Sequence, residues 1–321
     1  MRVVIVGSGI AAVAALQAMR AAGFSGKVTV VTNEAPPFYY RPMIPLLIDG
    51  SRTLAETKLT FDPLQGLDGE LVSDTVTALN TEKRELSLLS ERVLTYEKLL
   101  LATGSAPVLP PVAGLEGEGV FTLRTAADAL AIRAYIEREM VQAAVVLGGG
   151  LAGVKAAEAL RRAGLRVTLV ERLPFILYPA ADAAAATILS RRLKEAGVTV
   201  LTGVTAGEVT RKQGKVEAVR VGPHWIAAQL VVVATGVRPN LAFLKGSNIA
   251  YKTGILVDEH LQTNAPGIWA AGDVVEYREV LRRRSMVSGL WSNAVAMGKV
   301  AGANIAGFLK VANAMMAQGV V

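Results

Sequence analysis

The chain has 321 residues and not one cysteine. Without a thiol it forms no disulfide bond, holds no metal through a thiolate and has no cysteine nucleophile. It also cannot itself ligate an ordinary iron–sulfur cluster, because cysteine thiolates hold such clusters. Any redox chemistry on this chain therefore proceeds without a protein thiol.

Histidine is nearly as scarce, since only His224 and His260 are present. Two histidines without cysteine argue against a metal site and against a Ser-His triad, so we expect no bound metal. No apolar run approaches the roughly 18 residues of a membrane-spanning helix. The apolar stretch from Arg2 to Met19 could be read as a secretory signal, but two glycines break its centre. We therefore expect a cytoplasmic protein.

Aromatic residues make up only 5% of the chain, and the formal net charge is +7. The basic residues are scattered and no nucleic-acid-binding motif accompanies them, so we expect no nucleic acid partner. An acidic protein partner or phosphate groups match the positive excess better.

The residues that are abundant favour an α/β fold. Alanine, valine and leucine dominate the 52% of apolar residues, and there are 31 glycines. This composition is typical of buried parallel strands joined to helices by tight turns. The length is too great for one ordinary core and fits two domains.

The first specific pattern begins near the N-terminus, where an apolar run over residues 2–6 leads into GSGIAA at 7–12. An Ala-rich helix over 10–22 and a second apolar strand over 27–32 follow, and Glu34 comes just after. Strand, glycine turn, helix, strand and acid in this order form a dinucleotide-binding fingerprint. In such a unit the helix N-terminus holds the pyrophosphate and the acid accepts a ribose hydroxyl.

The same pattern returns in the middle of the chain. A strand over 143–147 leads into GGGLAG at 148–153, a helix over 151–163, a strand over 166–170 and Glu171. One such motif is weak support, because glycine-rich turns are common, but two in matching contexts are strong. They predict two bound dinucleotides and a hydride transfer between them.

Two further apolar runs define the domains. LLLATG at 99–104 closes the first unit, and LVVVATG at 230–236 closes the second. We expect residues 1–112 and 245–321 to form one domain and residues 113–244 to form a second domain inserted in it.

These segments resemble the two-dinucleotide-binding-domain flavoproteins, the FAD-dependent pyridine nucleotide-disulfide oxidoreductase family. The likeness rests on an ordered set of motifs, which are GSGIAA at 7–12, ATGSAP at 102–107, GGGLAG at 148–153, ATGVRPN at 234–240 and AGDV at 271–274. The resemblance implies two Rossmann-like domains, bound FAD and NAD, and an NAD(P)H-dependent oxidoreductase.

By this resemblance the first domain binds FAD. Gly7, Gly9 and Ala12 would let the backbone approach the pyrophosphate. Glu34 would bind the adenosine ribose. Asp273 would hold the ribityl or pyrophosphate region, although it could also be a helix N-cap. The other FAD-binding residues implied are Ala11, Arg41, Val76, Ala102, Thr103, Gly104, Gly272 and Trp291. For Arg41 a surface position is the alternative, and for Trp291 plain core packing.

The same resemblance assigns NAD to the second domain, with Gly148, Gly150 and Gly153 at the pyrophosphate. Glu171 would accept the ribose 2′-hydroxyl and repel a 2′-phosphate, which favours NADH over NADPH. Arg172 follows it directly and weakens that preference. The remaining NAD-site residues implied are Leu151 and Gly236.

The chain departs from the family at its redox-active positions. Disulfide reductases and cysteine-dependent peroxidases carry cysteine near the flavin, whereas this chain has FYYRPMIP at 38–45, with Pro42 at the single-cysteine position. Disulfide reduction and cysteine-sulfenate chemistry are therefore excluded. The Tyr-Arg-Pro string is closer to ferredoxin and rubredoxin reductases.

Two more departures affect the flavin. Many relatives have glutamate near the nicotinamide where this chain has Lys155. Lys155 would either face the flavin and raise its potential or be a solvent-facing lysine. The family also continues into a C-terminal interface domain, and this chain stops at Val321, so we expect that domain to be absent.

The leading functional prediction is an FAD subunit that moves electrons between NAD(H) and an iron–sulfur protein in a hetero-oligomer. It resembles flavin subunits of multisubunit oxidoreductases such as phenylglyoxylate dehydrogenase or tungsten aldehyde oxidoreductase, notably over residues 290–307. A basic cluster at Arg278, Arg282, Arg283 and Arg284 would dock an acidic partner, or would be a solvated loop. The alternatives are a stand-alone NADH oxidase or quinone reductase, and a non-catalytic flavin-binding scaffold.

Overall fold

In the computed structural model, which describes residues 1–279 and 284–317, the chain divides into two units. The first unit comprises Met1–Tyr40, Lys58–Ala106 and Arg238–Val321. The second comprises Arg41–Thr57 and Pro107–Val237. Along the chain, the second unit is thus inserted in the first.

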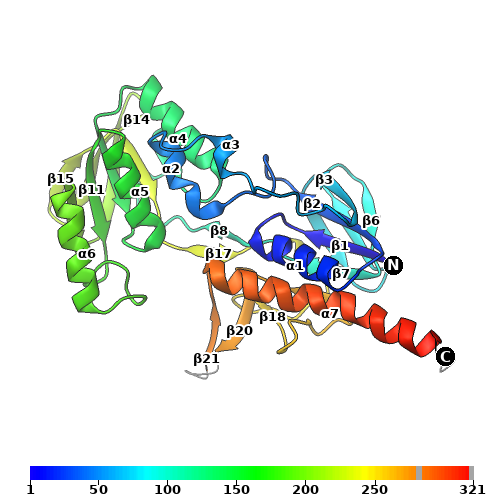
Figure 1. The fold of residues 1–321 in the computed structure, drawn as a ribbon. Helices are drawn as coiled ribbons and strands as arrows, with labels where there is room; N and C mark the ends of the chain where they lie inside the picture. Colours follow the sequence, from blue (N-terminus) through cyan, green and yellow to red (C-terminus); the bar gives the residue numbers. More distant parts are fainter. Residues whose placement is uncertain (280–283, 318–321) are drawn as a thin grey trace. The chain divides into compact units, whose positions relative to one another are not determined.

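The first unit is built on a five-stranded sheet whose neighbouring strands are all parallel (Figure 1). Its strands are β1 (Arg2–Val6), β2 (Lys27–Thr32), β3 (Asp68–Ser73), β7 (Lys98–Leu101) and β19 (Ile268–Ala270), in the order β19-β7-β1-β2-β3. Four of the five residues of β1 are buried, which is typical of a parallel sheet covered on both faces.

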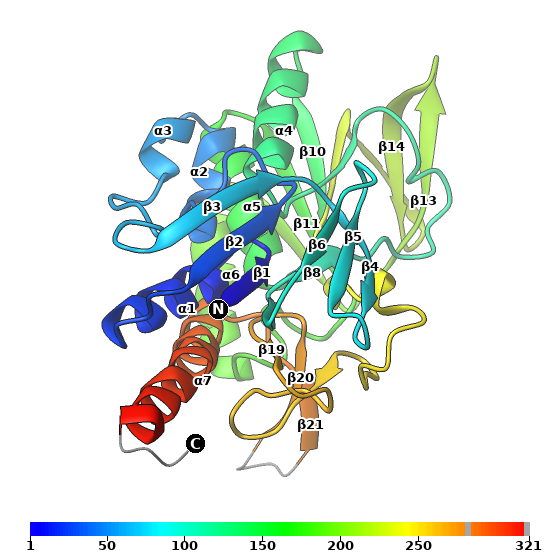
Figure 2. The same ribbon diagram turned by 90° about the vertical axis from the view of Figure 1, so that its right-hand side faces the viewer.

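Smaller elements complete the first unit. Its helices are α1 (Ile10–Ala21), α7 (Trp291–Ala317) and the 3-10 turn η2 (Ala242–Leu244). A meander contains β4 (Val76–Asn80), β5 (Glu85–Leu88) and β6 (Val93–Thr95), visible in Figure 2, and a third sheet contains β18 (Ile255–Leu256), β20 (Val275–Glu279) and β21 (Arg284–Val287). The short strands β8 (Ser105–Pro107) and β17 (Val237–Pro239) pair where the chain passes from one unit to the other.

The second unit repeats this plan. Its parallel sheet has the order β12-β11-β10-β16-β9, with β9 (Val120–Thr122), β10 (Ala143–Leu147), β11 (Arg166–Glu171), β12 (Val198–Thr202) and β16 (Leu230–Val233). A meander contains β13 (Ala206–Lys212), β14 (Lys215–Val221) and β15 (His224–Ala227). The helices are α2 (Pro45–Ile48), α3 (Leu54–Thr57), α4 (Ala126–Arg138), α5 (Leu151–Arg162), α6 (Ala183–Glu195) and the 3-10 turn η1 (Arg41–Met43).

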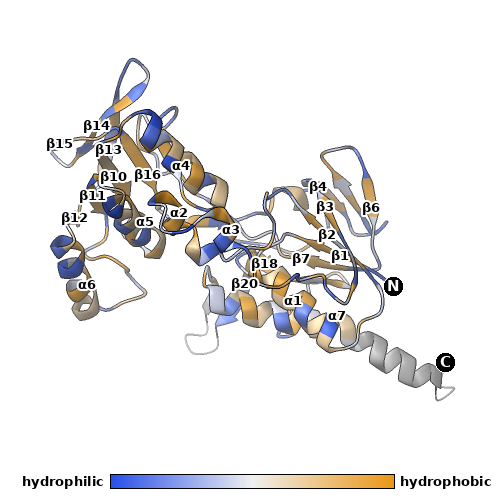
Figure 3. Ribbon diagram, turned by 45° about the horizontal axis from the view of Figure 1, so that its top comes forward, coloured by the Kyte–Doolittle hydropathy of each residue, from blue (hydrophilic) through white to orange (hydrophobic). Residues whose placement is uncertain are grey.

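The duplication predicted from the two fingerprints is confirmed. In each sheet the strand before the glycine turn is central, with the second fingerprint strand on one side and the strand before the Ala-Thr-Gly motif on the other. All five residues of β10 are buried, and Figure 3 colours β10 among the hydrophobic strands. The α/β class and the inserted arrangement therefore follow the prediction.

The unit boundaries differ from the predicted ranges, mainly at the segment Arg41–Thr57, which belongs to the second unit. Leu47 and Ile48 of α2 are buried. Asp49, whose side chain is only 2% exposed, forms an ion pair with Arg162 of α5. Burial alone would raise the Asp49 pKa, but hydrogen bonds from Ser51 and Arg162 outweigh it and hold the pKa below its ordinary value. Long-range contacts of this kind have no local sequence signal.

Helices α1 and α7 lie side by side in Figure 1 and pack through glycine. A Cβ on Gly298 would lie 2.2 Å from the carbonyl oxygen of Ala11, and one on Gly302 would lie 2.3 Å from that of Ala15. Both distances are far inside van der Waals contact, so only glycine permits this approach. The helix that begins the first fingerprint is therefore held by a helix more than 270 residues later in the chain.

This packing makes a prediction about stability. Gly298→Ala or Gly302→Ala should lower the free energy of unfolding by about 2 kcal/mol, because the added methyl group forces the helices apart. Gly307→Ala is the matched control in the same helix, since its Cβ would meet nothing within 4 Å. It should be neutral or stabilising by about 0.5–1 kcal/mol. Urea unfolding of the three variants measures the difference, and equal effects would contradict the glycine contact.

Candidate functional site

The first glycine turn is determined by a close backbone approach. Gly7 has φ +109°, and its N–H donates to the carbonyl oxygen of Val31 at 2.7 Å. A Cβ at this position would lie 2.2 Å from the carbonyl oxygen of Ala102. The turn after β1 therefore passes directly against the segment after β7. Gly7, Ala102 and the neighbouring Thr103 are thus brought together at the carboxyl edge of the sheet.

Gly9 differs from Gly7 because no contact within the chain requires glycine at this position. Its φ of −72° is ordinary, and a Cβ would meet nothing within 4 Å. It is the N-cap of α1, where backbone N–H groups are directed outward. Open space at a helix N-terminus is what the close approach of a pyrophosphate requires. Ala11 and Ala12 are buried immediately behind it.

Glu34 lies just after β2, where the fingerprint places its acid. The hydroxyl of Tyr39 donates to its Oε2 at 2.8 Å, and Tyr39 is buried. The hydroxyls of Ser8 and Thr32 are 2.9 Å apart and join the glycine turn to the end of β2. Sequence reasoning found the acid but missed Tyr39, the residue that orients it.

The Ala-Thr-Gly segment is held by Asn240, which the sequence analysis did not single out. The Asn240 side-chain amide donates to the Thr103 carbonyl at 2.8 Å, and its backbone N–H donates to the Gly104 carbonyl at 3.0 Å. The Thr103 hydroxyl returns a bond to the Asn240 carbonyl at 3.2 Å. Asn240 is the last residue of ATGVRPN, so the sequence signal for it was present in a motif assigned to the other domain.

Asp273 is placed by a glycine contact. Gly272 has φ +83°, and a Cβ on it would lie 3.1 Å from the Cβ of Ala11. Gly272 therefore packs against the start of α1, and Asp273 is the next residue in the chain. The hydroxyl of Ser105 donates to Asp273 Oδ2 at 3.1 Å. No helix begins at Asp273, because β20 follows it, and the N-cap alternative is therefore wrong.

The remaining predicted FAD residues occupy varied positions. Trp291 is the first residue of α7 and is half-buried, with its ring centroid 6.0 Å from that of Tyr40. Val76 begins β4 and packs against the hydrophobic core of the first unit. Arg41 belongs to the second unit, where its guanidinium donates to the Arg124 carbonyl at 3.0 Å.

The second glycine turn has the same division of roles. Gly148 has φ +103°, and its Cβ would lie 2.3 Å from the carbonyl oxygen of Ala234. A Cβ on Gly153 would lie 1.8 Å from the Gly148 carbonyl oxygen, so α5 can only start here with glycine. Gly150, like Gly9, has nothing within 4 Å of its Cβ position. Each fingerprint therefore has glycines that the fold requires and one that leaves open space.

Glu171 ends β11 and faces this turn. Its carboxylate accepts the Gly149 N–H at 2.5 Å and the Leu173 N–H at 2.7 Å. The side chain is half-buried, whereas the following Arg172 is exposed. The acid is therefore fixed beside the turn, as the fingerprint predicts.

The mouth of the second turn includes residues that were predicted and others that were missed. Leu151 is 57% exposed at the first position of α5, and Gly236 has φ +126° with open space around it. The missed part is the loop after Glu171, in which the Leu177 N–H donates to the Gly149 carbonyl at 2.8 Å. This loop carries the aromatic pair Phe175 and Tyr178, with ring centroids 5.3 Å apart.

Lys155 projects from α5 with 63% of its side chain exposed. Its ammonium lies 2.9 Å from Glu158 Oε2, and Glu158 also pairs with Arg162 at 2.8 Å. The hydrogen bond from Lys155 lowers the pKa of Glu158, which keeps this carboxylate charged. Lys155, Glu158 and Arg162 thus form a series of ion pairs along α5, the helix that starts at the second glycine turn, and Arg162 links this series to Asp49.

These two turns have the features of dinucleotide-binding fingerprints. Each offers a helix N-terminus, an open glycine and an acid at the end of the next strand. Among the residues that the structure describes, no three histidine, aspartate or glutamate side chains form a group that could hold a metal. Within the same ranges, no helix is long and apolar enough to cross a membrane.

Comparison with known proteins extends this picture. The family model described as pyridine nucleotide-disulphide oxidoreductase matches residues 1–298. The epsilon subunit of an NADH-dependent phenylglyoxylate dehydrogenase from Aromatoleum evansii is 32% identical, over 94% of this chain and 72% of that protein. An NADH oxidase from Methanocaldococcus jannaschii is 33% identical, over 96% of this chain and 70% of that protein.

The fold agrees as well. The crystal structure of a ferredoxin reductase from Rhodopseudomonas palustris superimposes with a TM-score of 0.89 at 26% identity, covering 95% of this chain and 76% of that one. The family binds FAD and NAD(P)H, and both fingerprints are present here with their geometry intact. The chain therefore belongs to the pyridine nucleotide-disulphide oxidoreductase family and is an NAD(P)H-dependent flavoprotein oxidoreductase without cysteine.

Proposed function

We propose that this chain passes electrons from NADH through FAD to an iron–sulfur protein, as one subunit of a hetero-oligomer in the cytoplasm. The observation that carries the proposal is the pairing of two intact fingerprints with the complete absence of cysteine. Two dinucleotides imply hydride transfer between them. Without cysteine, the electrons cannot pass to a protein disulfide, the acceptor after which the family is named.

In this proposal the first unit holds FAD. The N–H groups around Gly9 bind its pyrophosphate and Glu34, oriented by Tyr39, binds its ribose. Asp273 and the Thr103–Gly104 segment, held by Asn240, border the rest of the cofactor. When bound, FAD accepts a hydride and can release the electrons one at a time.

The second unit holds NAD(H) in the same way. The N–H groups around Gly150 bind the pyrophosphate, and Glu171 accepts the ribose 2′-hydroxyl. A 2′-phosphate at that place would meet the carboxylate, so NADH is preferred to NADPH. No general acid or base is required, because positioning and charge suffice for hydride transfer.

The nature of the electron acceptor rests on two lines of support. One relative is named as a subunit of an NADH-dependent dehydrogenase, and one similar structure is named a ferredoxin reductase. The basic cluster proposed to dock an acidic partner falls largely on Arg282 and Arg283, which lie outside the described residues. Arg278 lies on β20, and only the backbone of Arg284 is described, on β21.

A second candidate is a stand-alone NADH oxidase or quinone reductase, because one relative is named an NADH oxidase. A non-catalytic scaffold is a weaker candidate, since both fingerprints retain every residue that their turns require. The choice of acceptor separates these possibilities.

Steady-state turnover with NADH decides among them. The proposal predicts that a small iron–sulfur protein is reduced at least about tenfold faster than oxygen or a benzoquinone at equal concentration. Faster turnover with oxygen or quinone would favour the oxidase. Absence of turnover with every acceptor, at full FAD occupancy, would favour the scaffold.

The open glycines give a prediction that separates binding from folding. Gly150→Ala should raise the Kd for NADH by about tenfold or more while FAD content and thermal stability stay unchanged, because the methyl group enters only the pyrophosphate space. Gly9→Ala should reduce FAD content instead. Gly148→Ala is the contrasting variant, since its methyl group clashes with the chain and should lower stability. Retained NADH affinity in Gly150→Ala would contradict the assignment of this turn.

The Lys155 proposal concerns the flavin potential. If the Lys155 charge faces the flavin, Lys155→Glu should lower the midpoint potential by about 30 mV, which corresponds to roughly 1.4 kcal/mol for two electrons. Lys194→Glu makes the same charge change on exposed α6 and should have a much smaller effect. Spectroelectrochemical titration measures both, and an unchanged potential in Lys155→Glu would leave Lys155 as a solvent-facing residue.

A further inference from the structure

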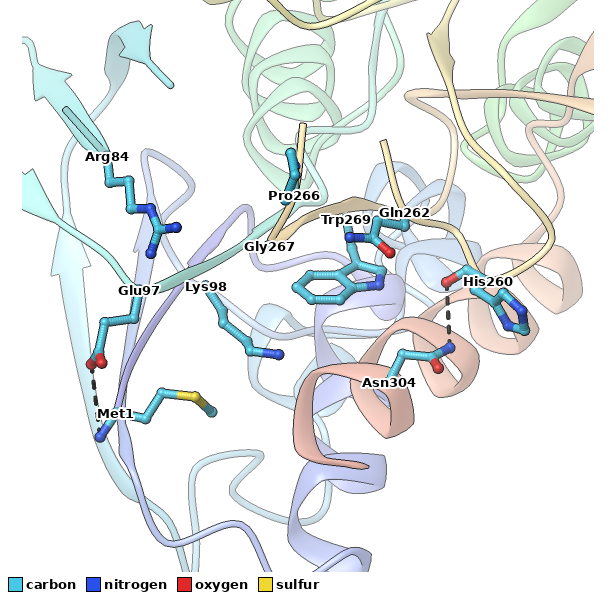
Figure 4. A pocket seen from close by; sticks show the side chains of 10 residues that line it. All are labelled: Met1, Arg84, Glu97, Lys98, His260, Gln262, Pro266, Gly267, Trp269 and Asn304. Carbon is cyan, nitrogen blue, oxygen red and sulfur yellow. Dashed lines mark hydrogen bonds and ion pairs between the residues drawn. The ribbon is translucent and has the colours of Figure 1, made fainter. Parts of the chain in front are cut away.

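A hollow of about 560 Å³ opens at the amino-terminal edge of the first unit's sheet. Its lining includes Lys98, the first residue of β7, and Trp269 of β19 (Figure 4). The FAD residues Ala102 and Gly272 follow the carboxyl ends of these same strands. The hollow is therefore at the opposite edge of the sheet from the proposed flavin site, and its size is within the usual range of small-molecule sites.

Two buried donors in this region have no hydrogen-bond partner among the described residues. The indole Nε1 of Trp269 is one of them, and the Trp269 side chain is only 5% exposed. The hydroxyl of Tyr96, which is 3% exposed and lines an adjoining hollow of about 370 Å³, is the other. An unsatisfied buried donor costs about 1–3 kcal/mol, so the unpaired indole N–H of Trp269, whose residue lines the first hollow, indicates a site that an acceptor would complete.

The charged groups around the hollow favour an anion. Arg84 lines both hollows and forms no ion pair with any residue in the described ranges. The Lys98 ammonium lies 4.8 Å from the centroid of the Trp269 ring, and burial lowers the pKa of Lys98. The Lys98 cation thus borders the apolar surface of Trp269, and Arg84 lines the same hollow.

Glu97, the carboxylate that lines the first hollow, is engaged at the N-terminus of the chain. Glu97 Oε2 accepts the Arg2 N–H at 2.5 Å and lies 3.7 Å from the Met1 ammonium, the contact drawn in Figure 4. Glu82 lines only the adjoining hollow, and His260 is largely exposed at the rim of the first. The first hollow therefore combines two cations, an unpaired indole donor and an apolar wall.

We propose that this hollow binds a small organic dianion, a dicarboxylate or a phosphate ester, in addition to the two dinucleotides. One acidic group would lie between Arg84 and Lys98, and the indole N–H of Trp269 would donate to the ligand. The organic part would lie against Trp269 and Pro266, which also lines the hollow. The amide of Gln262 supplies a further polar contact at the wall.

Isothermal titration calorimetry on the FAD-loaded protein tests this site. Saturating NAD⁺ keeps both fingerprints occupied, and citrate and pyrophosphate serve as the carboxylate and phosphate probes. Arg84→Gln should raise the Kd of the binding probe by about tenfold. Trp269→Phe, which removes the indole N–H and keeps an aromatic ring, should raise it by roughly threefold. Lys83→Gln is the matched control, because it removes the same charge one residue away and outside the hollow.

The proposal predicts less than a twofold change in the Kd for Lys83→Gln and an unchanged melting temperature in Arg84→Gln and Lys83→Gln. Trp269→Phe removes atoms from the core and should lower the melting temperature, so its Kd is measured at a temperature where it is fully folded. Binding of only one probe would support the site and identify the acidic group. Equal weakening in Arg84→Gln and Lys83→Gln would overturn the proposal, because it would reflect general surface charge. Absence of saturable heat with both probes up to about 10 mM would overturn it as well.

Discussion

Two close backbone contacts fix the two glycine turns on which the rest of the structure depends. At Gly7 and Gly148 the turn after the central strand passes so close to a facing carbonyl that no Cβ fits. Each contact joins a fingerprint turn to an Ala-Thr-Gly segment, 95 residues later in the first unit and 86 residues later in the second, and so brings together the parts of one fingerprint site. The helix N-terminus, the open glycine and the acid are then all at the carboxyl edge of a parallel sheet, where α/β proteins bind their ligands.

Local patterns were sufficient to predict the central strands and the fingerprint helices of both units. The apolar runs at 2–6 and 143–147 became β1 and β10 with the predicted bounds. The meanders and the position of the segment Arg41–Thr57 were not predicted. Short exposed strands carry a weak pattern, and the Asp49–Arg162 ion pair joins residues whose proximity exists only in the folded chain.

The same limit applies to the sites. Glycines and acids follow from the motif because the turn dictates them, and the structure brings Gly7 against the Ala102–Thr103 segment. Tyr39, which orients Glu34, and Asn240, which holds the Thr103–Gly104 segment, were missed, because side chains that support a site depend on tertiary contacts. Asn240 does lie within a motif that the sequence offers, and only its role there depends on the folded chain. Lys155 illustrates the opposite case, a residue conspicuous in sequence whose charge the structure pairs with Glu158.

Because the chain has no cysteine, its capacity for electrons is that of one FAD, and this is the central claim of the account. Anaerobic titration of the FAD-loaded protein with NADH, followed by flavin absorbance, measures that capacity directly. The account predicts complete bleaching of the flavin at one equivalent of NADH per chain. A requirement for two equivalents would reveal a second redox group. Absence of bleaching would show that NADH does not reduce the FAD on this chain. Either result would contradict the account.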